Sequence, residues 1–153
     1  MKVKTLNKSG SKELLEEINK LYNVEPFSKK DKVELVEDEY KYVKVNNEVL
    51  FFYHENKIVP TLKLLLKNNF LKTITVDMGA IKYVANGSDV MRPGITNINS
   101  EIKKDDYVSI IDEQNKRPIA IGKAIFDADE LKSQQTGKSI LSIHYVGDKI
   151  WKL

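Results

Sequence analysis

The sequence predicts an α+β protein built from two units, on the basis of three observations. Apolar residues recur at helical spacing between residues 11 and 22, which indicates an amphipathic helix. Residues 33–59 are rich in β-branched and aromatic side chains and are interrupted by polar pairs, which is typical of strands joined by tight turns. From residue 73 onward, short strand-like segments alternate with turns and contain little helix, which favours a closed or nearly closed barrel.

The first unit, residues 1–72, is expected to be a small α+β domain. Val3–Leu6 has the composition of a short strand, and Ser9-Gly10-Ser11 supplies residues that commonly start a helix. The strands between 33 and 59 should form an antiparallel meander. Pro60 is expected to be the first residue of a second helix, because the N–H that proline lacks would have no partner at that position. A unit of about 70 residues is near the lower limit for independent folding, so it should pack firmly on the second unit.

The second unit, residues 73–153, is expected to be the barrel. Its predicted helices are short, one at Gly79–Val84 and a single turn around Asp127–Lys132. Gly147-Asp148 is expected to make a hairpin turn into a last strand at Lys149–Lys152. The other predicted strands are Thr73–Val76, Ile95 with its neighbours, Tyr107–Ile111, Ile119–Phe126 and Ser139–Val146.

The composition is that of a folded protein with a charged surface, since 41% of the 153 residues are hydrophobic and 31% are charged. No apolar run approaches the ~20 residues that span a bilayer, and no apolar segment of a secretory signal comes after the first lysines. The absence of cysteine excludes disulfides and thiolate sites. These observations predict a cytoplasmic protein with no membrane segment.

The formal charge of +3 is unevenly distributed along the chain. Residues 1–73 contain 14 lysines and 11 acidic residues, whereas residues 74–153 contain 11 basic and 11 acidic residues. A generic binder of polyanions has a basic surplus where it touches phosphate. Any nucleic-acid site in the second unit must therefore be a local patch.

One segment, Val76–Ile95, is the most informative in the chain. It contains three of the seven glycines, Gly79, Gly87 and Gly94, on either side of one short helix. Glycine is favoured where the backbone needs a positive φ or approaches another group closely. The segment therefore predicts either turns or a close approach of the backbone to a ligand.

The runs Val76–Lys82 and Val90–Ile95 strongly resemble the opening of a PUA domain, an RNA-binding module named after pseudouridine synthases and archaeosine transglycosylases. The whole chain resembles the malignant T-cell amplified sequence proteins and their archaeal relatives. Ile143-His144-Tyr145, together with Asp148 and Trp151, points to this family in particular. The resemblance implies a small α+β pre-PUA domain, residues 1–72, packed on a PUA pseudo-β-barrel, residues 73–153.

The resemblance also implies an RNA-binding protein of the translation apparatus. Eukaryotic members act with a partner factor at the small ribosomal subunit in recycling and re-initiation. Ribosomal RNA or tRNA is accordingly the expected partner, with the small subunit and a translation factor as further candidates. The candidate RNA-binding residues are Gly79, Ala80, Lys82, Arg92, Pro93, Gly94 and Lys123.

The candidate cations each have a structural alternative. Arg92 is one of two arginines among 25 basic residues, so its planar fork of donors suggests a phosphate or a base edge. It would otherwise form a salt bridge with Asp89 or Asp77. Lys82 is either an RNA contact or a solvated lysine on a short helix. Lys123 interrupts an apolar strand and is expected to face solvent, on the same face as Arg92.

Other side chains suggest structure rather than chemistry. Asp77 precedes Gly79 and is expected to cap the short helix by accepting from its free N–H groups. A catalytic acid–base role for Asp77 is rejected, because no second carboxylate, nucleophile or glycine-rich cofactor loop accompanies it. Two histidines without cysteine make no metal site, and His144 is expected to pack. We therefore expect no enzyme activity, metal or cofactor. Met78 and Met91 are predicted core residues, as are Tyr83, Tyr107 and Trp151, although these three rings could also stack on bases.

Three functions remain compatible with the sequence. The first is non-catalytic RNA binding in translation, in which Lys82, Arg92 and backbone amides near Gly79 and Gly94 hold the RNA. The densest lysine run, Lys29, Lys30 and Lys32, is either a solvated loop or an extension of the RNA footprint. The second is a protein–protein adaptor, whose signature would be an exposed apolar patch on the 33–59 meander. The third is an RNA-targeting subunit for a separate RNA-modification enzyme.

Overall fold

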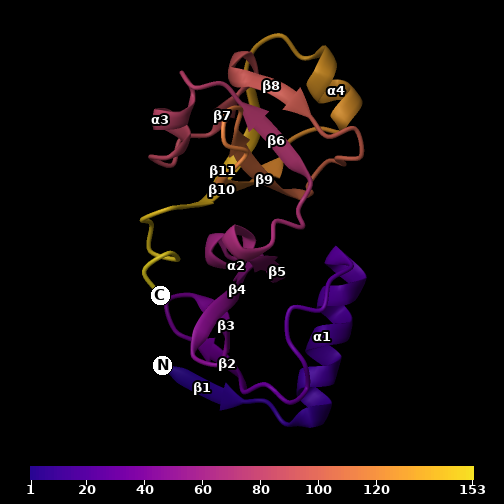
Figure 1. Ribbon diagram of the computed structural model, residues 1–153, viewed down its shortest axis with the longest axis vertical. Coiled ribbons are helices and arrows are strands. Elements are labelled where there is room, and N and C mark those ends of the chain that lie inside the picture. The colour runs from indigo at the N-terminus through magenta and orange to yellow at the C-terminus, as the bar shows by residue number, and fades with distance from the viewer.

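The chain folds into two sheets that succeed one another along the long axis of the molecule (Figure 1). The computed structural model describes residues 1–153. The first sheet is the predicted antiparallel meander, and its strands pair in the order in which they occur along the chain. These strands are β1 (Lys2–Thr5), β2 (Val33–Glu37), β3 (Lys41–Val45), β4 (Glu48–His54) and β5 (Lys57–Pro60).

Helix α1 (Lys8–Tyr22) covers one face of this sheet, as the helical spacing predicts. Leu14 and Ile18 are buried and belong to the same apolar cluster as Phe51 of β4. The helix begins three residues earlier than predicted because Asn7 is its cap. The Asn7 Oδ1 atom accepts a hydrogen bond of 2.8 Å from the N–H of Gly10, which satisfies one of the free donors at the helix start.

The second helix, α2 (Leu62–Lys67), begins two residues later than predicted. Pro60 is the last residue of β5 and pairs with Phe51, so it continues the strand instead of opening the helix. Thr61 is the cap: its hydroxyl oxygen accepts from the N–H of Leu64 at 3.3 Å, and its own N–H donates to the carbonyl of Leu50 at 2.9 Å. The threonine hydroxyl, rather than the proline ring, therefore decides where this helix starts.

The second sheet forms the nearly closed barrel. Its strand order is β7-β11-β10-β9-β6-β8, with only β6 and β9 parallel. The 3-10 turn η1 (Arg92–Gly94) joins the two outer strands, β7 (Val90–Met91) and β8 (Ile95–Ile98), and so brings the open edges together. The remaining elements are β6 (Thr73–Val76), α3 (Ile81–Val84), β9 (Tyr107–Asp112), β10 (Pro118–Ala124), α4 (Ala128–Ser133) and β11 (Lys138–Tyr145).

The last strand predicted at Lys149–Lys152 is absent. The carboxylate of Asp148 instead accepts hydrogen bonds from the N–H groups of Tyr145, at 2.9 Å, and Trp151, at 2.8 Å. These bonds hold the chain after β11 in consecutive turns, so no hairpin forms at Gly147-Asp148. Figure 1 shows that this C-terminal segment leaves the barrel and runs back to the first sheet.

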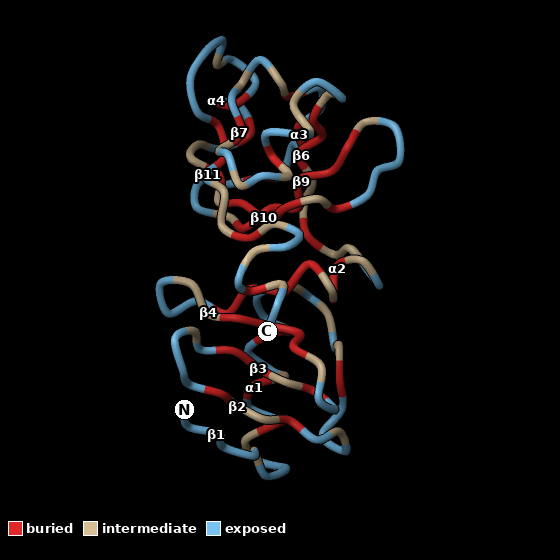
Figure 2. Tube along the Cα trace, turned by 90° about the vertical axis from the view of Figure 1, so that its left-hand side faces the viewer, coloured by how far each residue is buried: buried red, intermediate tan, exposed pale blue.

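The two sheets share an apolar cluster at the join, and each also has a cluster of its own. Tyr107, Ile121 and Ile150 of the second unit pack in the same cluster as Phe52 and Leu65 of the first. Figure 2 shows that β4 and β10, on the two sides of the join, are largely buried. This shared cluster is consistent with the expectation that the units pack firmly. Their division into separate domains at residues 72 and 73 stays a prediction.

His144 is the main polar link across the join. It is fully buried, and its Nε2 atom accepts a hydrogen bond of 3.1 Å from the N–H of Leu62 at the start of α2. Its Nδ1–H donates to the carboxylate of Asp148, at 2.9 Å. Burial lowers the pKa of His144, and the opposing effect of Asp148 is smaller. The ring is therefore neutral at neutral pH, and its hydrogen bond with Leu62 links the two units.

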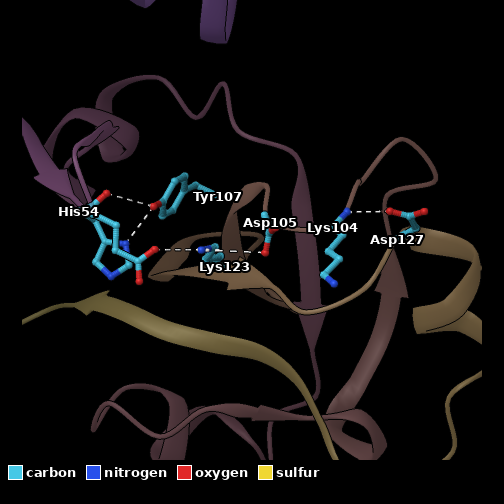
Figure 3. Close-up of polar contacts among 7 residues, drawn as sticks. His54, Lys104, Asp105, Tyr107, Lys123 and Asp127 are labelled. Carbon is cyan, nitrogen blue, oxygen red and sulfur yellow. Dashed lines mark hydrogen bonds and ion pairs between the residues drawn. The ribbon is translucent and has the colours of Figure 1, made fainter.

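A second polar contact joins the units at the surface (Figure 3). The hydroxyl of Tyr107 lies 2.8 Å from Nδ1 of His54. Beside it, the Nζ of Lys123 lies 3.1 Å from the carboxylate of Glu55 and 3.9 Å from that of Asp105. Lys123 therefore does not face open solvent as predicted. Its side chain is 17% exposed and bridges β10 to the β4–β5 turn of the first unit.

Candidate nucleic-acid interface

A groove of about 800 Å³ opens on the barrel between α3 and the turn η1. Both of its walls come from the glycine-marked segment Val76–Ile95. One residue of β11, Lys138, completes the lining. The residues around the groove are Asp77, Gly79, Ala80, Tyr83, Val84, Gly87, Ser88, Asp89, Val90, Met91, Pro93, Gly94 and Lys138.

Asp77 fixes the floor of the groove, but it holds the turn before α3 rather than capping the helix itself as predicted, because α3 begins at Ile81 without a side-chain cap. Its Oδ1 atom accepts a hydrogen bond of 2.8 Å from the N–H of Ala80, which holds the turn that leads into α3. Its own N–H donates to the carbonyl of Gly94, at 2.9 Å. One residue therefore ties together the two chain segments that form the walls. The N–H of Gly79, in the turn that leads into α3, donates to no acceptor in the protein.

The three glycines have different roles. Gly87 has a φ of +93°, and a Cβ atom there would lie 2.6 Å from the ring of Tyr145, so both predicted reasons apply. Gly94 has no positive φ, but a Cβ atom would lie 3.0 Å from the Cβ of Ala80 across the floor. Gly79 meets neither condition, since a Cβ atom would lie at an ordinary 3.4 Å from Asp77. Gly79 does lie in a turn, the one before α3, as predicted, and the close approach of a ligand to its backbone stays a prediction.

Exposed apolar side chains form the rim. Tyr83 of α3 is 58% exposed and Met91 of β7 is 48% exposed. Both were predicted to lie in the core, as was Met78, which is also exposed. The short α3 has one buried residue, Val84, so the neighbouring Tyr83 projects outward. A large exposed ring beside a groove is the arrangement in which aromatic residues stack on bases.

Two lysines supply positive charge at the rim. Lys82 is exposed, and its Nζ atom lies 5.0 Å from the centre of the Tyr83 ring, within cation–π distance. Lys138 lies 3.0 Å from the carboxylate of Asp89. Burial alone would raise the pKa of Asp89, but the hydrogen bond from the N–H of Ser142 and the contact with Lys138 lower it. Asp89 therefore stays ionised and positions Lys138. This lysine was not among the predicted residues because β11 is distant in sequence from the glycine-marked segment.

Arg92 is held by the protein itself. Its Nε atom donates to the carbonyl of Leu131 at 2.7 Å, and its Nη1 atom donates to the carbonyl of Ile95 at 3.2 Å. A longer contact of 3.5 Å reaches the carbonyl of Lys132. The guanidinium thus ties η1 to the end of α4 and forms no salt bridge with Asp77 or Asp89. A contact between Arg92 and RNA stays a prediction that this geometry does not support.

The variant Arg92→Ala should be less stable than the wild-type protein by about 1–3 kcal/mol, because it leaves carbonyl groups without their charged donor. Arg92→Lys should recover little of this loss, since an ammonium group cannot reproduce the planar fork. Urea unfolding of both variants measures the change. RNA affinity of the folded variants should stay close to that of the wild-type protein. An Arg92→Ala protein with wild-type stability and weakened RNA binding would contradict this assignment.

The structure thus brings together some of the predicted residues. Gly79, Ala80, Pro93 and Gly94 line the groove, and Lys82 stands at its rim. Lys123 lies at the join between the units instead. Tyr107 and Trp151 also belong to that join, as packing residues. No group of three or more His, Asp or Glu side chains is arranged to hold a metal ion. No helix in the structure has the length and apolar character needed to cross a membrane.

Comparison with known proteins agrees with this architecture. Residues 72–146 match the PUA domain family, and residues 5–68 match a domain described as a domain of unknown function, DUF1947. An uncharacterized protein of Methanocaldococcus jannaschii is 42% identical over 95% of this chain and 93% of its own length. Translation machinery-associated protein 20 of Saccharomyces cerevisiae is 36% identical over 80% of this chain and 73% of its own. Malignant T-cell-amplified sequence 1 of Danio rerio is 34% identical over 82% of this chain and 73% of its own.

The chain belongs to the malignant T-cell-amplified sequence family. The resemblance seen in the sequence is therefore confirmed, and so is the α+β fold with a barrel of the PUA type. A crystal structure of a hypothetical protein from Pyrococcus horikoshii covers 99% of this chain and 98% of its own, with a TM-score of 0.84 and 29% identity. The archaeal Nop10–Cbf5 complex of the box H/ACA sRNP covers 61% of this chain and 29% of its own, with a TM-score of 0.51 and 28% identity.

Proposed function

We propose that this family member is a non-catalytic RNA-binding protein of the translation apparatus, and that RNA binds in the groove between α3 and η1. The observation that carries the proposal is the groove itself, which is lined by the exposed Tyr83 and by the backbone at Gly79 and Ala80, with the Nζ of Lys82 5.0 Å from the Tyr83 ring. The matched PUA domain supports RNA as the ligand. Relatives named translation machinery-associated protein support translation as the process.

The chemistry of the groove suits a few defined contacts with RNA. The ring of Tyr83 and the thioether of Met91 offer apolar surface to a base, and Lys82 and Lys138 offer ammonium groups to phosphates. The free N–H of Gly79 is a further donor at the floor. Because residues 74–153 carry no net charge, these contacts rather than a broad positive field would supply the affinity.

We infer that the RNA is ribosomal RNA or tRNA at the small ribosomal subunit, in the cytoplasm. A translation factor bound at the same time is a further expected partner. Crosslinking the protein to RNA in cell extract, followed by sequencing of the captured fragments, identifies the RNA. Fragments drawn evenly from all cellular RNA would contradict a dedicated role in translation.

Replacing Tyr83 by alanine should weaken RNA binding by about 1–3 kcal/mol, because one stacked base loses its partner. Replacing Lys138 by alanine should lower the salt dependence by about one phosphate contact. Fluorescence anisotropy with a labelled RNA from the crosslinking experiment, at several salt concentrations, measures both effects. Lys132→Ala is the matched control, because Lys132 is an exposed lysine on α4 outside the groove. Equal RNA affinities for the wild-type protein and the three variants would show that RNA does not bind in this groove.

The adaptor alternative has less support than RNA binding. Its expected signature was an exposed apolar patch on the meander, yet no large hydrophobic side chain between residues 33 and 59 is exposed. The third alternative, a targeting subunit for an RNA-modification enzyme, draws only on the partial likeness to the Nop10–Cbf5 complex. Nuclease treatment of the purified complex distinguishes these functions. It should release partners under the RNA proposal and leave a protein partner attached under either alternative.

A further inference from the structure

Lysines are concentrated at one end of the first sheet. They gather where β2 begins, and acidic residues gather where it ends, at Glu37, Asp38 and Glu39. At this other end the acidic residues have lysine neighbours, since Glu37 lies opposite Lys2 and Lys41 in the strand register. The lysine end consists of Lys8, Lys29, Lys30, Lys32 and Lys44. Only Lys32 has a carboxylate within 4.0 Å, that of Glu34 at 3.7 Å, so the other four ammonium groups have no ion-pair partner.

Strand pairing places these lysines at one end of the sheet. The N–H of Leu6, two residues before Lys8, donates to the carbonyl of Val33 at 2.8 Å. Lys44 pairs with Glu34 across β2 and β3. The N–H of Asn46 donates to the carbonyl of Lys32 at 2.9 Å. The start of α1, the turn before β2 and the end of β3 therefore meet at this end.

The turn that carries Lys29 and Lys30 is held in place by its own acidic residue. The carboxylate of Asp31 accepts from the N–H of Ser28 at 2.8 Å and from the side-chain amide of Asn46 at 3.0 Å. The amide oxygen of Asn46 accepts in turn from the N–H of Lys32, at 3.0 Å. Asp31 therefore faces into the turn, whereas Lys29 and Lys30 are exposed.

We propose that the lysine end is a second RNA-binding surface, which takes the phosphate backbone of a duplex segment. Lysines are flexible point charges and suit phosphates, and no exposed aromatic side chain stands near them to read a base. Duplex RNA presents its phosphates and ribose hydroxyls outward, so it suits a surface of this kind. An acidic protein or an anionic membrane is the alternative ligand of the same charge.

The lysine end and the groove lie in different parts of the molecule. Figure 1 shows the start of α1 at the foot of the molecule, while α3 and β7, which border the groove, lie in the upper half. The shared apolar cluster at the join fixes one surface relative to the other. The protein would therefore hold two RNA segments at a set separation. The inference rests on the proposed function for the class of ligand, but it concerns a separate surface.

A charge-reversal pair tests the inference in the full-length protein. Lys29→Glu with Lys30→Glu should weaken binding to a labelled blunt RNA duplex by about tenfold in 0.1 M salt, and lower the salt slope by about two contacts. The matched control is Lys103→Glu with Lys104→Glu, which changes the charge equally at an exposed loop of the barrel. The control should bind the duplex as the wild-type protein does. Circular dichroism establishes that both variants are folded.

The outcomes separate this inference from the proposed groove. Equal binding of the duplex by the Lys29/Lys30 variant and the control overturns the lysine end as an RNA surface. The same conclusion holds if the wild-type protein ignores the duplex but binds anionic vesicles or an acidic polypeptide through these lysines. If Tyr83→Ala loses affinity for the crosslinked RNA but still binds the duplex, the result concerns the groove and not the lysine end. Loss of duplex binding in the Lys29/Lys30 variant alone supports the inference even if the groove binds no RNA.

Discussion

Replacing His144 by alanine is expected to lower the free energy of unfolding by about 3–5 kcal/mol. The imidazole is fully buried, and its removal leaves a cavity beside Phe52, whose ring centre lies 5.4 Å away. The N–H of Leu62 and the carboxylate of Asp148 would also lose their shared partner. Buried polar groups without partners add their own penalty. The destabilisation should be greatest at the join between the units, because His144 links β11 to α2.

Urea unfolding of His144→Ala and of the matched variant His54→Ala measures this effect. His54 is the other histidine at the join, but it is partly exposed, and its Nδ1 contact with Tyr107 is only half-buried. Its loss should cost about 1 kcal/mol. Comparable losses in the two variants would contradict the role assigned to His144. A melting temperature lowered by about 10 °C in His144→Ala is the equivalent thermal result.

The same residue predicts how stability changes with pH. Burial lowers the pKa of His144 in the folded state below its unfolded value of about 6.5. The unfolded chain therefore binds more protons below that pH, and stability falls as the pH drops from about 6.5 towards the folded pKa. Protonation of Nε2 would also remove the acceptor for the N–H of Leu62. This part of the pH dependence should disappear in His144→Ala.

Replacing Gly122 by alanine is expected to cost about 3 kcal/mol, the second large effect. A Cβ atom at this position would lie 2.3 Å from the Cγ2 of Ile140 and 2.7 Å from the carbonyl oxygen of Leu141. Ile140 is fully buried in the barrel core, and the second clash is with backbone, so β10 and β11 would have to separate. Overpacking of this kind usually costs a few kcal/mol.

Gly147→Ala is the control for the Gly122 substitution. Gly147 has a φ of +92°, but a Cβ atom there would meet nothing within 4 Å, so its substitution carries only a conformational cost. That cost is about 1–2 kcal/mol. Gly122 lacks the positive φ, so its cost is purely steric. Thermal unfolding of both variants compares the two costs. A Gly122→Ala protein as stable as Gly147→Ala would contradict the close packing inferred between β10 and β11.

Local patterns predicted much of the fold. The helical spacing of Leu14 and Ile18 indicated α1, and the aromatic and β-branched composition of 33–59 indicated the meander. The errors were also local. Thr61 rather than Pro60 starts α2, and Asp148 coils the chain where a final strand was expected. In each case, one side-chain oxygen forms hydrogen bonds to the backbone that override the predicted element. The spacing of apolar residues does not predict such single hydrogen bonds.

The candidate site was predicted only where its residues are close in sequence. The segment Val76–Ile95 forms both walls of the groove, so most of the groove's lining could be predicted from this one segment. Lys138, Arg92 and Lys123 depend on partners far along the chain, namely Asp89, Leu131 and Glu55. A single sequence contains no information on such pairs. Tyr83 was misjudged for a different reason, because a four-residue helix is too short for its spacing to indicate which side is buried.

The most direct test of the groove is an NMR titration of the full-length protein with its crosslinked RNA. The backbone amide signals of Gly79, Ala80, Tyr83 and Gly94 should shift together and saturate, while those of α4 at the outer side of the barrel stay in place. The Tyr83→Ala protein should need more RNA to reach the same shifts. Saturating shifts elsewhere on the molecule, with these four signals unmoved, would contradict RNA binding between α3 and η1.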